Sequence, residues 1–206
     1  VIRAVGNAPS RFAEDPLRIL RAARFASQLG FTVEETTRDA MAQLAYRLQD
    51  ISTERIAAEM NRLLMGVAPS NGMQLMRDTG LLPFTIPELT DIAEDVIQGR
   101  HKDIWDHTMQ VLDKTPPRLG LRWAALLHDA GKPRTRTIDN YGEVHFFGHE
   151  RVGADMARRA MRRLRQDRAL TLRVTRLVDL HLRPAGYDET WTDSAVRRLM
   201  VEVGDE

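Results

Sequence analysis

The sequence predicts an all-α protein that carries one short β-hairpin. Apolar residues recur at helical spacing along most of the 206 residues, and capping residues and glycines mark where helices begin and end. One stretch, RTRTIDNYGEVHFF, shows instead the alternation and the central turn of a hairpin. No apolar run approaches the roughly 18 residues of a membrane span, so the chain is expected to be cytoplasmic and to have no membrane partner.

The first helix is expected in the segment EDPLRILRAARFASQLGF, which opens at Glu14. Its apolar stripe is expected within residues 16–29. Asp15 before Pro16 is typical of an N-cap followed by proline at the first helical position, and Gly30 is typical of a helix end. The apolar stripe of this helix follows the i, i+3, i+4, i+7 spacing and comprises Ile19, Ala22, Ala23, Ala26 and Leu29.

Later segments repeat these signals, for example Ser52 as a cap and Gly80 as a stop. Helices are expected at about 34–48, 53–65, 70–78, 88–98, 103–113, 120–130, 149–165, 169–182 and 193–203. The hairpin is expected to alternate through Thr135, Thr137, Val144 and Phe146 around the Asn140–Gly142 turn. The prolines of LLPFTIPEL interrupt the helical pattern and predict a domain boundary near 85–100.

The composition restricts the kinds of site that the chain can hold. With no cysteine, disulfides and thiolate metal sites are excluded, so any metal must be bound by His, Asp or Glu. Only three of the 30 basic residues are lysine, and arginine is the better bidentate phosphate ligand. Nine arginines lie between Arg158 and Arg183, against Asp167 and Asp179. This stretch predicts either a surface that follows a phosphate backbone or a solvated helix face.

EDPLR allows two interpretations. Asp15 and Arg18 lie one helical turn apart, so their side chains point to the same side, where an acceptor and a planar donor fork could pair with the edge of a nucleobase. In the alternative, Glu14 and Asp15 only cap the positive end of the helix. From these residues alone, capping is the favoured interpretation.

All six histidines follow residue 100, and together they indicate a metal site. In ALLHDAGKP, His128 and Asp129 end an apolar helix, and an imidazole beside a carboxylate suits a divalent ion. His107 and His181 lie on the inner faces of two other helices; each alone would more often be a core histidine. Lys132 could hold a substrate phosphate or act as a cation at a helix C-terminus.

This arrangement resembles the HD superfamily of metal-dependent phosphohydrolases, all-α domains with an H…HD…D signature. The resemblance places the metal ligands at His107, His128, Asp129, His149 and His181. The final aspartate departs from the pattern, because Asp179 lies two residues before His181 on a helix and points elsewhere. The resemblance implies a divalent ion, such as Ni²⁺, Mn²⁺, Mg²⁺ or Fe²⁺, that activates water for phosphoester hydrolysis.

The motifs EDxxR, RFxxxLGF and ERIxxE followed by this HD pattern resemble the bacterial class II tRNA nucleotidyltransferase/poly(A) polymerase family, over essentially the whole chain. The resemblance implies that Asp15 and Arg18 read the base of CTP or ATP, that Glu14 and Arg21 support them, and that tRNA is the partner. It also implies that Glu54, Arg55 and Glu59 brace the helices, with an intrahelical Arg55–Glu59 pair. Arg24 is expected to steady the same face or to reach phosphate.

By the same resemblance, residues 1–12 end a nucleotidyltransferase head and its linker, 13–95 form a helical neck for base selection and RNA binding, and 96–206 form an HD domain cut short at its C-terminus. The catalytic carboxylates and the two Mg²⁺ ions of the family belong to the head, and no Gly-Ser pair with a following DxD motif occurs here. We therefore expect base selection without nucleotidyl transfer. The alternatives are an HD phosphohydrolase acting on nucleotide or cyclic phosphate esters and a metal-free scaffold whose arginines bind tRNA.

Overall fold

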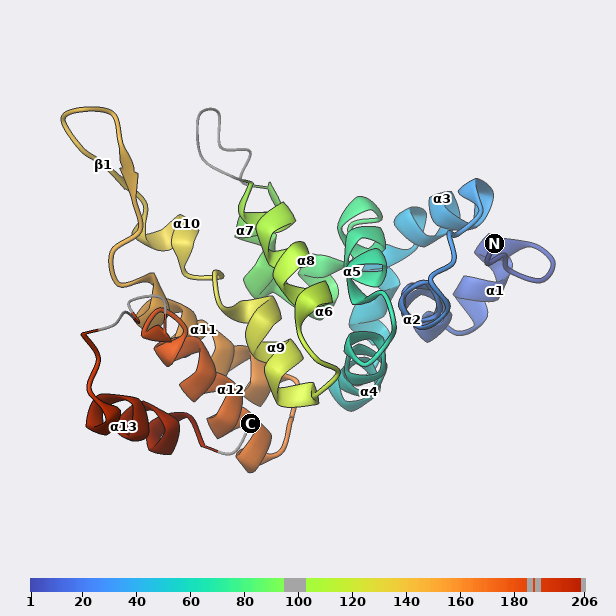
Figure 1. Ribbon diagram of the computed structural model, residues 1–206. Helices are drawn as coiled ribbons and strands as arrows, with labels where there is room; N and C mark the ends of the chain where they lie inside the picture. The colour runs from blue at the N-terminus through green and yellow to red at the C-terminus, as the bar shows by residue number, and fades with distance from the viewer. Residues whose placement is uncertain (95–102, 185–186, 188–189, 205–206) are drawn as a thin grey trace.

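The computed structural model describes residues 1–94, 103–184, 187 and 190–204, and in this part the chain is a row of α-helices with one projecting hairpin (Figure 1). At one end lie α1 (Ala8–Glu14), α2 (Leu17–Leu29), α3 (Glu35–Gln43), the 3₁₀ helix η1 (Ala45–Asp50), α4 (Thr53–Leu64) and α5 (Pro69–Asp78). The middle contains α6 (Leu82–Thr85), η2 (Pro87–Leu89), α7 (Thr90–Glu94), α8 (Ile104–Lys114), α9 (Leu119–Leu127) and α10 (Lys132–Thr135). The other end contains β1 (Thr137–Ile138), β2 (Val144–His145), α11 (His149–Arg163), α12 (Arg168–Leu180) and α13 (Asp193–Val203). The predicted all-α class with a single short hairpin is confirmed.

Helix α2 is the centre of the N-terminal half, where it packs against α4 and α5. Its predicted stripe is buried apart from Leu29, and Gly30 ends the helix in the left-handed conformation at φ 65°. Helix α5 approaches α2 closely at Gly72, where a Cβ atom would lie 2.8 Å from the carbonyl oxygen of Ala23. A side chain at this position would therefore force the two helices apart.

The start of the EDPLR helix differs from the prediction. Glu14 ends the separate helix α1, and Asp15 is extended at φ −145° before α2 begins. Its Oδ1 atom accepts a hydrogen bond from the backbone N–H of Leu17 at 3.2 Å, so Asp15 does cap the helix. Helix α1 was not predicted, although Asn7 caps it, because its seven residues are too few for apolar periodicity to emerge.

Most other predicted helices are confirmed to within three residues at each end. The helix expected at 34–48 is instead divided at Leu44 into α3 and η1. The helix expected at 88–98 corresponds to η2 and α7, and its last four positions lie outside the described residues. The short helices α6 and α10 were missed for the same reason as α1.

The hairpin has the predicted turn. Thr137 pairs with His145 and Ile138 with Val144, and Gly142 takes the positive φ of 81° that the turn requires. The carboxylate of Asp139 closes the turn by accepting hydrogen bonds from the backbone N–H groups of Tyr141 and Glu143, at 2.8 and 2.9 Å.

One apolar core joins the two halves across the predicted boundary at 85–100. The Trp123 indole donates to Asn61 at 2.8 Å, and the Trp105 indole donates to Gln74 at 2.8 Å. The buried guanidinium of Arg122 on α9 donates to the carbonyl oxygens of Leu64, the last residue of α4, and of Gly66, just beyond it. Helices α8 and α9 are thereby fixed against α4 and α5.

The expected intrahelical Arg55–Glu59 pair is wrong: Arg55 pairs outside its own helix, and Glu59 pairs with Arg24 of α2 and with Arg62, three residues on in α4. Arg55 reaches Asp15, with 3.5 Å between its Nη2 atom and Oδ1. Glu59 is buried beside Arg24, with 3.1 Å between Oε2 and Nε. Burial lowers the pKa of Arg24 and the charge of Glu59 opposes that shift. Because Arg24 is buried and paired, it steadies the helices and does not face a phosphate.

Among the residues that the structure describes, none of the helices is both long enough and apolar enough to cross a membrane.

Candidate functional site

A group of histidines meets around one buried aspartate where several helices end. His107 lies on α8, His128 and Asp129 follow α9, His149 begins α11, and His181 follows α12. These are the five residues that the sequence assigned to a metal, and the structure brings all of them together. They form two sets of possible ligands that share Asp129.

The two carboxylate oxygens of Asp129 face different histidine pairs. Oδ2 lies 3.2 Å from Nε2 of His128 and 3.7 Å from Nε2 of His107. Oδ1 lies 3.5 Å from Nε2 of His149 and 3.9 Å from Nε2 of His181. With only 2% of its side chain exposed, Asp129 is the common centre of both pairs.

The backbone orients three of the four rings. Nδ1 of His128 lies 2.8 Å from the carbonyl oxygen of Ala125, and the Nδ1 atoms of His149 and His181 lie 2.7 Å from the carbonyl oxygens of Phe146 and Val178. A carbonyl can only accept, so each Nδ1–H donates to the backbone and each Nε2 faces Asp129. Metal-binding histidines are oriented in this way in proteins. The residues present therefore fit a divalent cation.

The charges around Asp129 also suit a cation. Burial acts to raise the pKa of Asp129, but hydrogen bonds from His128 and His149 and the charge of Lys132 outweigh it and hold this pKa well below its usual range. Burial lowers the pKa of His181, and the neighbouring His128 and His149 add to this shift. For His149, burial also acts to lower the pKa, but the hydrogen bond to Asp129 outweighs it and the pKa is raised. The centre thus holds an ionised carboxylate among imidazole rings.

Lys132 is the first residue of α10, and its Nζ atom donates to Oδ2 of Asp129 at 2.7 Å. Gly131, just before it, allows α11 to approach, because a Cβ atom there would lie 2.4 Å from the carbonyl oxygen of His149. Asp179 is exposed and belongs to neither ligand set. It lines a separate depression of about 270 Å³ with Glu150 and Arg151.

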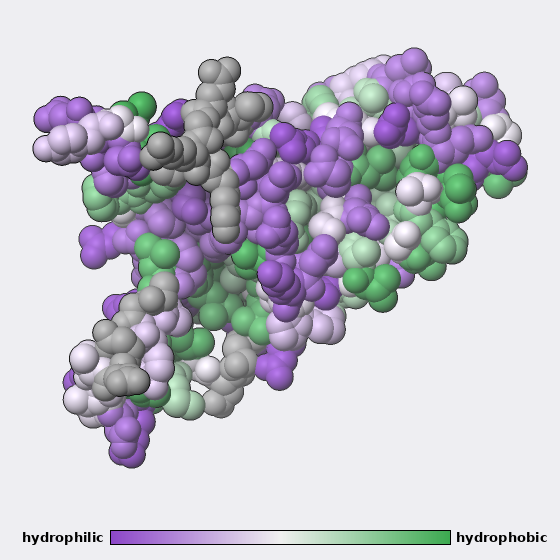
Figure 2. All heavy atoms as spheres, turned by 45° about the horizontal axis from the view of Figure 1, so that its top comes forward, coloured by the Kyte–Doolittle hydropathy of each residue, from purple (hydrophilic) through white to green (hydrophobic). Residues whose placement is uncertain are grey.

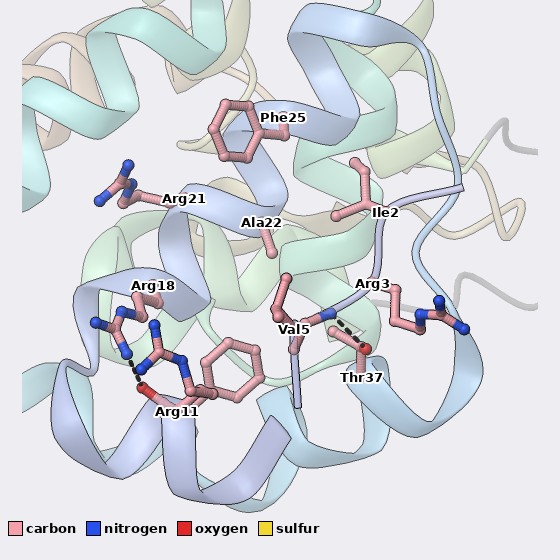
Figure 3. A pocket seen from close by; sticks show the side chains of 11 residues that line it. Ile2, Arg3, Val5, Arg11, Arg18, Arg21, Ala22, Phe25 and Thr37 are labelled. Carbon is pink, nitrogen blue, oxygen red and sulfur yellow. Dashed lines mark hydrogen bonds between the residues drawn. The ribbon is translucent and has the colours of Figure 1, made fainter. Parts of the chain in front are cut away.

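The second candidate site is a pocket of about 460 Å³ between the N-terminal segment and α2 (Figure 3). Four arginines, Arg3, Arg11, Arg18 and Arg21, line it together with the aromatic rings of Phe12 and Phe25. Arg11 was not predicted from the sequence, because it lies on α1, the helix that periodicity missed; its place in SRFAEDPLR, one turn before Glu14, was the available signal.

Asp15 and Arg18 have separate charged partners. Arg18 donates to Glu14 at 2.7 Å and to the carbonyl oxygen of Arg11 at 2.9 Å. The hydrogen bond from Arg18 and the charges of Arg18 and Arg11 lower the pKa of Glu14. Asp15 is outside the pocket lining, where the N–H of Leu17 and the guanidinium of Arg55 hold its carboxylate. Glu14 therefore fixes Arg18, and Arg55 fixes Asp15.

The arginine-rich stretch is partly neutralised within the protein. Several of its arginines form ion pairs, among them Arg158 with Asp155, Arg163 with Glu88, Arg165 with Glu54, and Arg183 with Glu202. Arg159, Arg162, Arg168 and Arg176 are exposed. Arg159 and Arg162 lie on α11, whereas Arg168 and Arg176 lie on α12, so the stretch does not form one continuous helix face.

Two family models match this chain. A model described as a probable RNA and SrmB-binding site of polymerase A matches residues 30–92, and the HD domain matches residues 104–201. An A-adding tRNA nucleotidyltransferase of Deinococcus radiodurans is 36% identical over 197 residues, which cover 89% of this chain and 45% of that protein. A CC-adding tRNA nucleotidyltransferase of Thermus thermophilus is 36% identical over 184 residues, which cover 82% of this chain and 42% of that protein.

A solved structure has a similar fold. The CCA-adding enzyme of Bacillus stearothermophilus in complex with CTP superposes with a TM-score of 0.63 at 24% identity, over 98% of this chain and 43% of that one. The chain thus spans less than half of the length of the relatives that it matches.

Proposed function

Because this chain belongs to the family of bacterial tRNA nucleotidyltransferases and poly(A) polymerases, we propose that it supplies base selection and RNA binding for the addition of CCA or of A to tRNA 3′ ends. CTP and ATP are then the nucleotides, tRNA is the macromolecular partner, and the nucleotidyl transfer with its Mg²⁺ ions belongs to a catalytic head.

The observation that carries this proposal is the pair of fixed side chains around EDPLR. The carboxylate of Asp15 is held by Arg55 and the guanidinium of Arg18 by Glu14. A fixed acceptor and a fixed donor fork can discriminate between bases, because a base with the wrong edge would leave a polar group without its partner. Arg11 and Arg21, in the pocket beside Arg18, add positive charge that suits a triphosphate.

Asp15→Ala is expected to reduce the discrimination between CTP and ATP by about ten-fold or more, because it removes the fixed acceptor. The measurement is the ratio of CTP to ATP incorporation into tRNA by a chimera that joins this chain to the catalytic head of the Deinococcus radiodurans relative. Asp39→Ala, an exposed aspartate on α3, is the matched control and should leave the ratio unchanged. Unchanged selection in Asp15→Ala would contradict the assignment.

A second function, metal-dependent hydrolysis of nucleotide or cyclic phosphate esters, is favoured by the convergence of imidazole nitrogens on Asp129. His107 and His128 would hold an ion on one side of Asp129, and His149 and His181 on the other. When bound, a divalent ion supplies an activated water and a positive charge for a phosphoryl oxygen. Lys132 lies at the same carboxylate and is placed to attract the phosphate.

The test of this second function is hydrolysis of 2′,3′-cyclic AMP and of 2′-AMP in the presence of Ni²⁺, Mn²⁺ or Mg²⁺. Hydrolysis is expected from the native chain and is expected to fall at least about 100-fold in the His128→Ala/Asp129→Ala double variant, which lacks two ligands. Equal activity of the two proteins would assign the hydrolysis to a contaminant and remove the proposal.

A further inference from the structure

Two aromatic rings are stacked on the outer face of the hairpin. The imidazole of His145 and the ring of Phe147 are nearly parallel, with an interplanar angle of 11° and 5.0 Å between their centroids. Phe147 is 78% exposed, although phenylalanine is among the residue types most often buried in proteins. In Figure 2 the hairpin forms the lobe at the upper left, which is largely hydrophilic with isolated apolar residues.

The stacked pair is held in place by the turn of the hairpin. Nε2 of His145 lies 2.9 Å from Oδ2 of Asp139. The other oxygen of the same carboxylate accepts the backbone N–H groups of Tyr141 and Glu143. Asp139 is therefore fixed by the turn, His145 is fixed by Asp139, and Phe147 is supported by the imidazole. A ring that is already ordered loses little conformational freedom when a ligand covers it.

The stacked rings of His145 and Phe147 lie close in the chain to His149, which belongs to the histidine group around Asp129. The carbonyl oxygen of Phe146 accepts the Nδ1–H of His149, whose Nε2 faces Asp129. Lys132, which binds Asp129, lies 5.6 Å from the centroid of the Phe146 ring. Phe147 is two residues from His149 across the turn at Gly148, so their Cα atoms lie no more than about 7 Å apart. A ligand of the size of a nucleotide can therefore extend from one to the other.

We propose that Phe147, backed by His145, is a stacking shelf for the nucleobase of a nucleotide whose phosphate lies at the Asp129 centre. Nucleobases are planar and stack on aromatic rings with little dependence on sequence, which suits a single flat exposed ring. The hairpin also exposes Ile138 and Tyr141, but its exposed surface includes charged residues such as Glu143 and Arg136, and the ring stacked on Phe147 is a polar imidazole, so a planar base with polar edges fits better than an apolar protein partner. The inference deepens the second function above and rests on it for the position of the phosphate.

The test is equilibrium binding of 5′-AMP and of ribose 5-phosphate to the metal-free chain, measured by calorimetry or by NMR titration. Phe147→Ala is expected to weaken 5′-AMP binding about ten-fold or more, and to change ribose 5-phosphate binding less than about two-fold, since only the former has a base to stack. Phe147→Trp should retain 5′-AMP binding. Phe31→Ala, which removes another exposed phenylalanine, is the matched control and should not affect it.

A third ligand, a short single-stranded RNA that ends in CCA, distinguishes the source of the base. A loss confined to the RNA would assign the shelf to a tRNA end, and a loss confined to 5′-AMP would assign it to free nucleotides. Equal weakening for 5′-AMP and ribose 5-phosphate, or no weakening for either 5′-AMP or RNA, would overturn the shelf. Because no step of this test requires hydrolysis, an inactive metal centre would leave the binding result interpretable and would count against the second function alone.

Discussion

Asp129→Ala is expected to abolish the binding of divalent cations by this chain, with a loss of more than about 100-fold in affinity. The reason is geometric: Asp129 is shared by both ligand sets, and its two oxygens separate His107 and His128 from His149 and His181. Without the carboxylate, each site retains only two imidazoles. The measurement is the metal content after dialysis against Ni²⁺ or Mn²⁺, together with calorimetric titration.

Asp179→Ala is the matched control, because it removes the same group from an exposed position beside His181 without touching either ligand set. Asp129→Asn keeps the shape of the buried side chain and separates loss of metal from loss of fold. If Asp129→Ala retained the native metal content, or if Asp179→Ala lost it equally, the centre would be assigned wrongly.

Local pattern placed four of these five residues at a helix end or on an inner helix face, and His149 followed only from the resemblance to the HD superfamily. His128 and Asp129 follow an apolar helix, and His107 and His181 have the spacing of buried positions. What the sequence could not supply was the second contact of each ring. The carbonyl oxygens of Ala125, Phe146 and Val178 orient the histidines, and backbone groups carry no signature of their own in a sequence.

The EDPLR region was predicted less completely, for a different physical reason. Asp15 and Arg18 were expected to act together, but each has its own charged partner: Asp15 has Arg55 of α4, which tertiary packing brings near, and Arg18 has Glu14, four residues earlier. The spacing of Arg55 and Glu59 suits an intrahelical pair, yet packing of α2 on α4 offers each a partner outside α4: Asp15 for Arg55 and Arg24 for Glu59. Propensity and spacing describe one helix at a time, so contacts between helices escape them.

Arg122→Met is expected to lower the free energy of unfolding by about 3–5 kcal/mol. The guanidinium is buried and donates to three backbone carbonyl oxygens, those of Leu64, Gly66 and Thr115. Leu64 ends helix α4 and Gly66 lies just beyond it, where carbonyls have no partner within the helix. Methionine fills much of the volume but donates nothing, so the oxygens of Leu64 and Gly66 would stay buried without their donor. Denaturation by urea, followed by circular dichroism, measures the change.

Arg118→Met makes the same chemical change one turn earlier on an exposed side chain, and should shift the free energy of unfolding by less than about 0.5 kcal/mol. Because Arg122 connects α9 to the end of α4, its loss should also separate the unfolding of the two halves. Circular dichroism and the fluorescence of Trp123, which contacts Asn61 of α4, would then report different midpoints. A native midpoint in Arg122→Met would show that the apolar core alone holds the halves together, and that the buried arginine contributes no net stability.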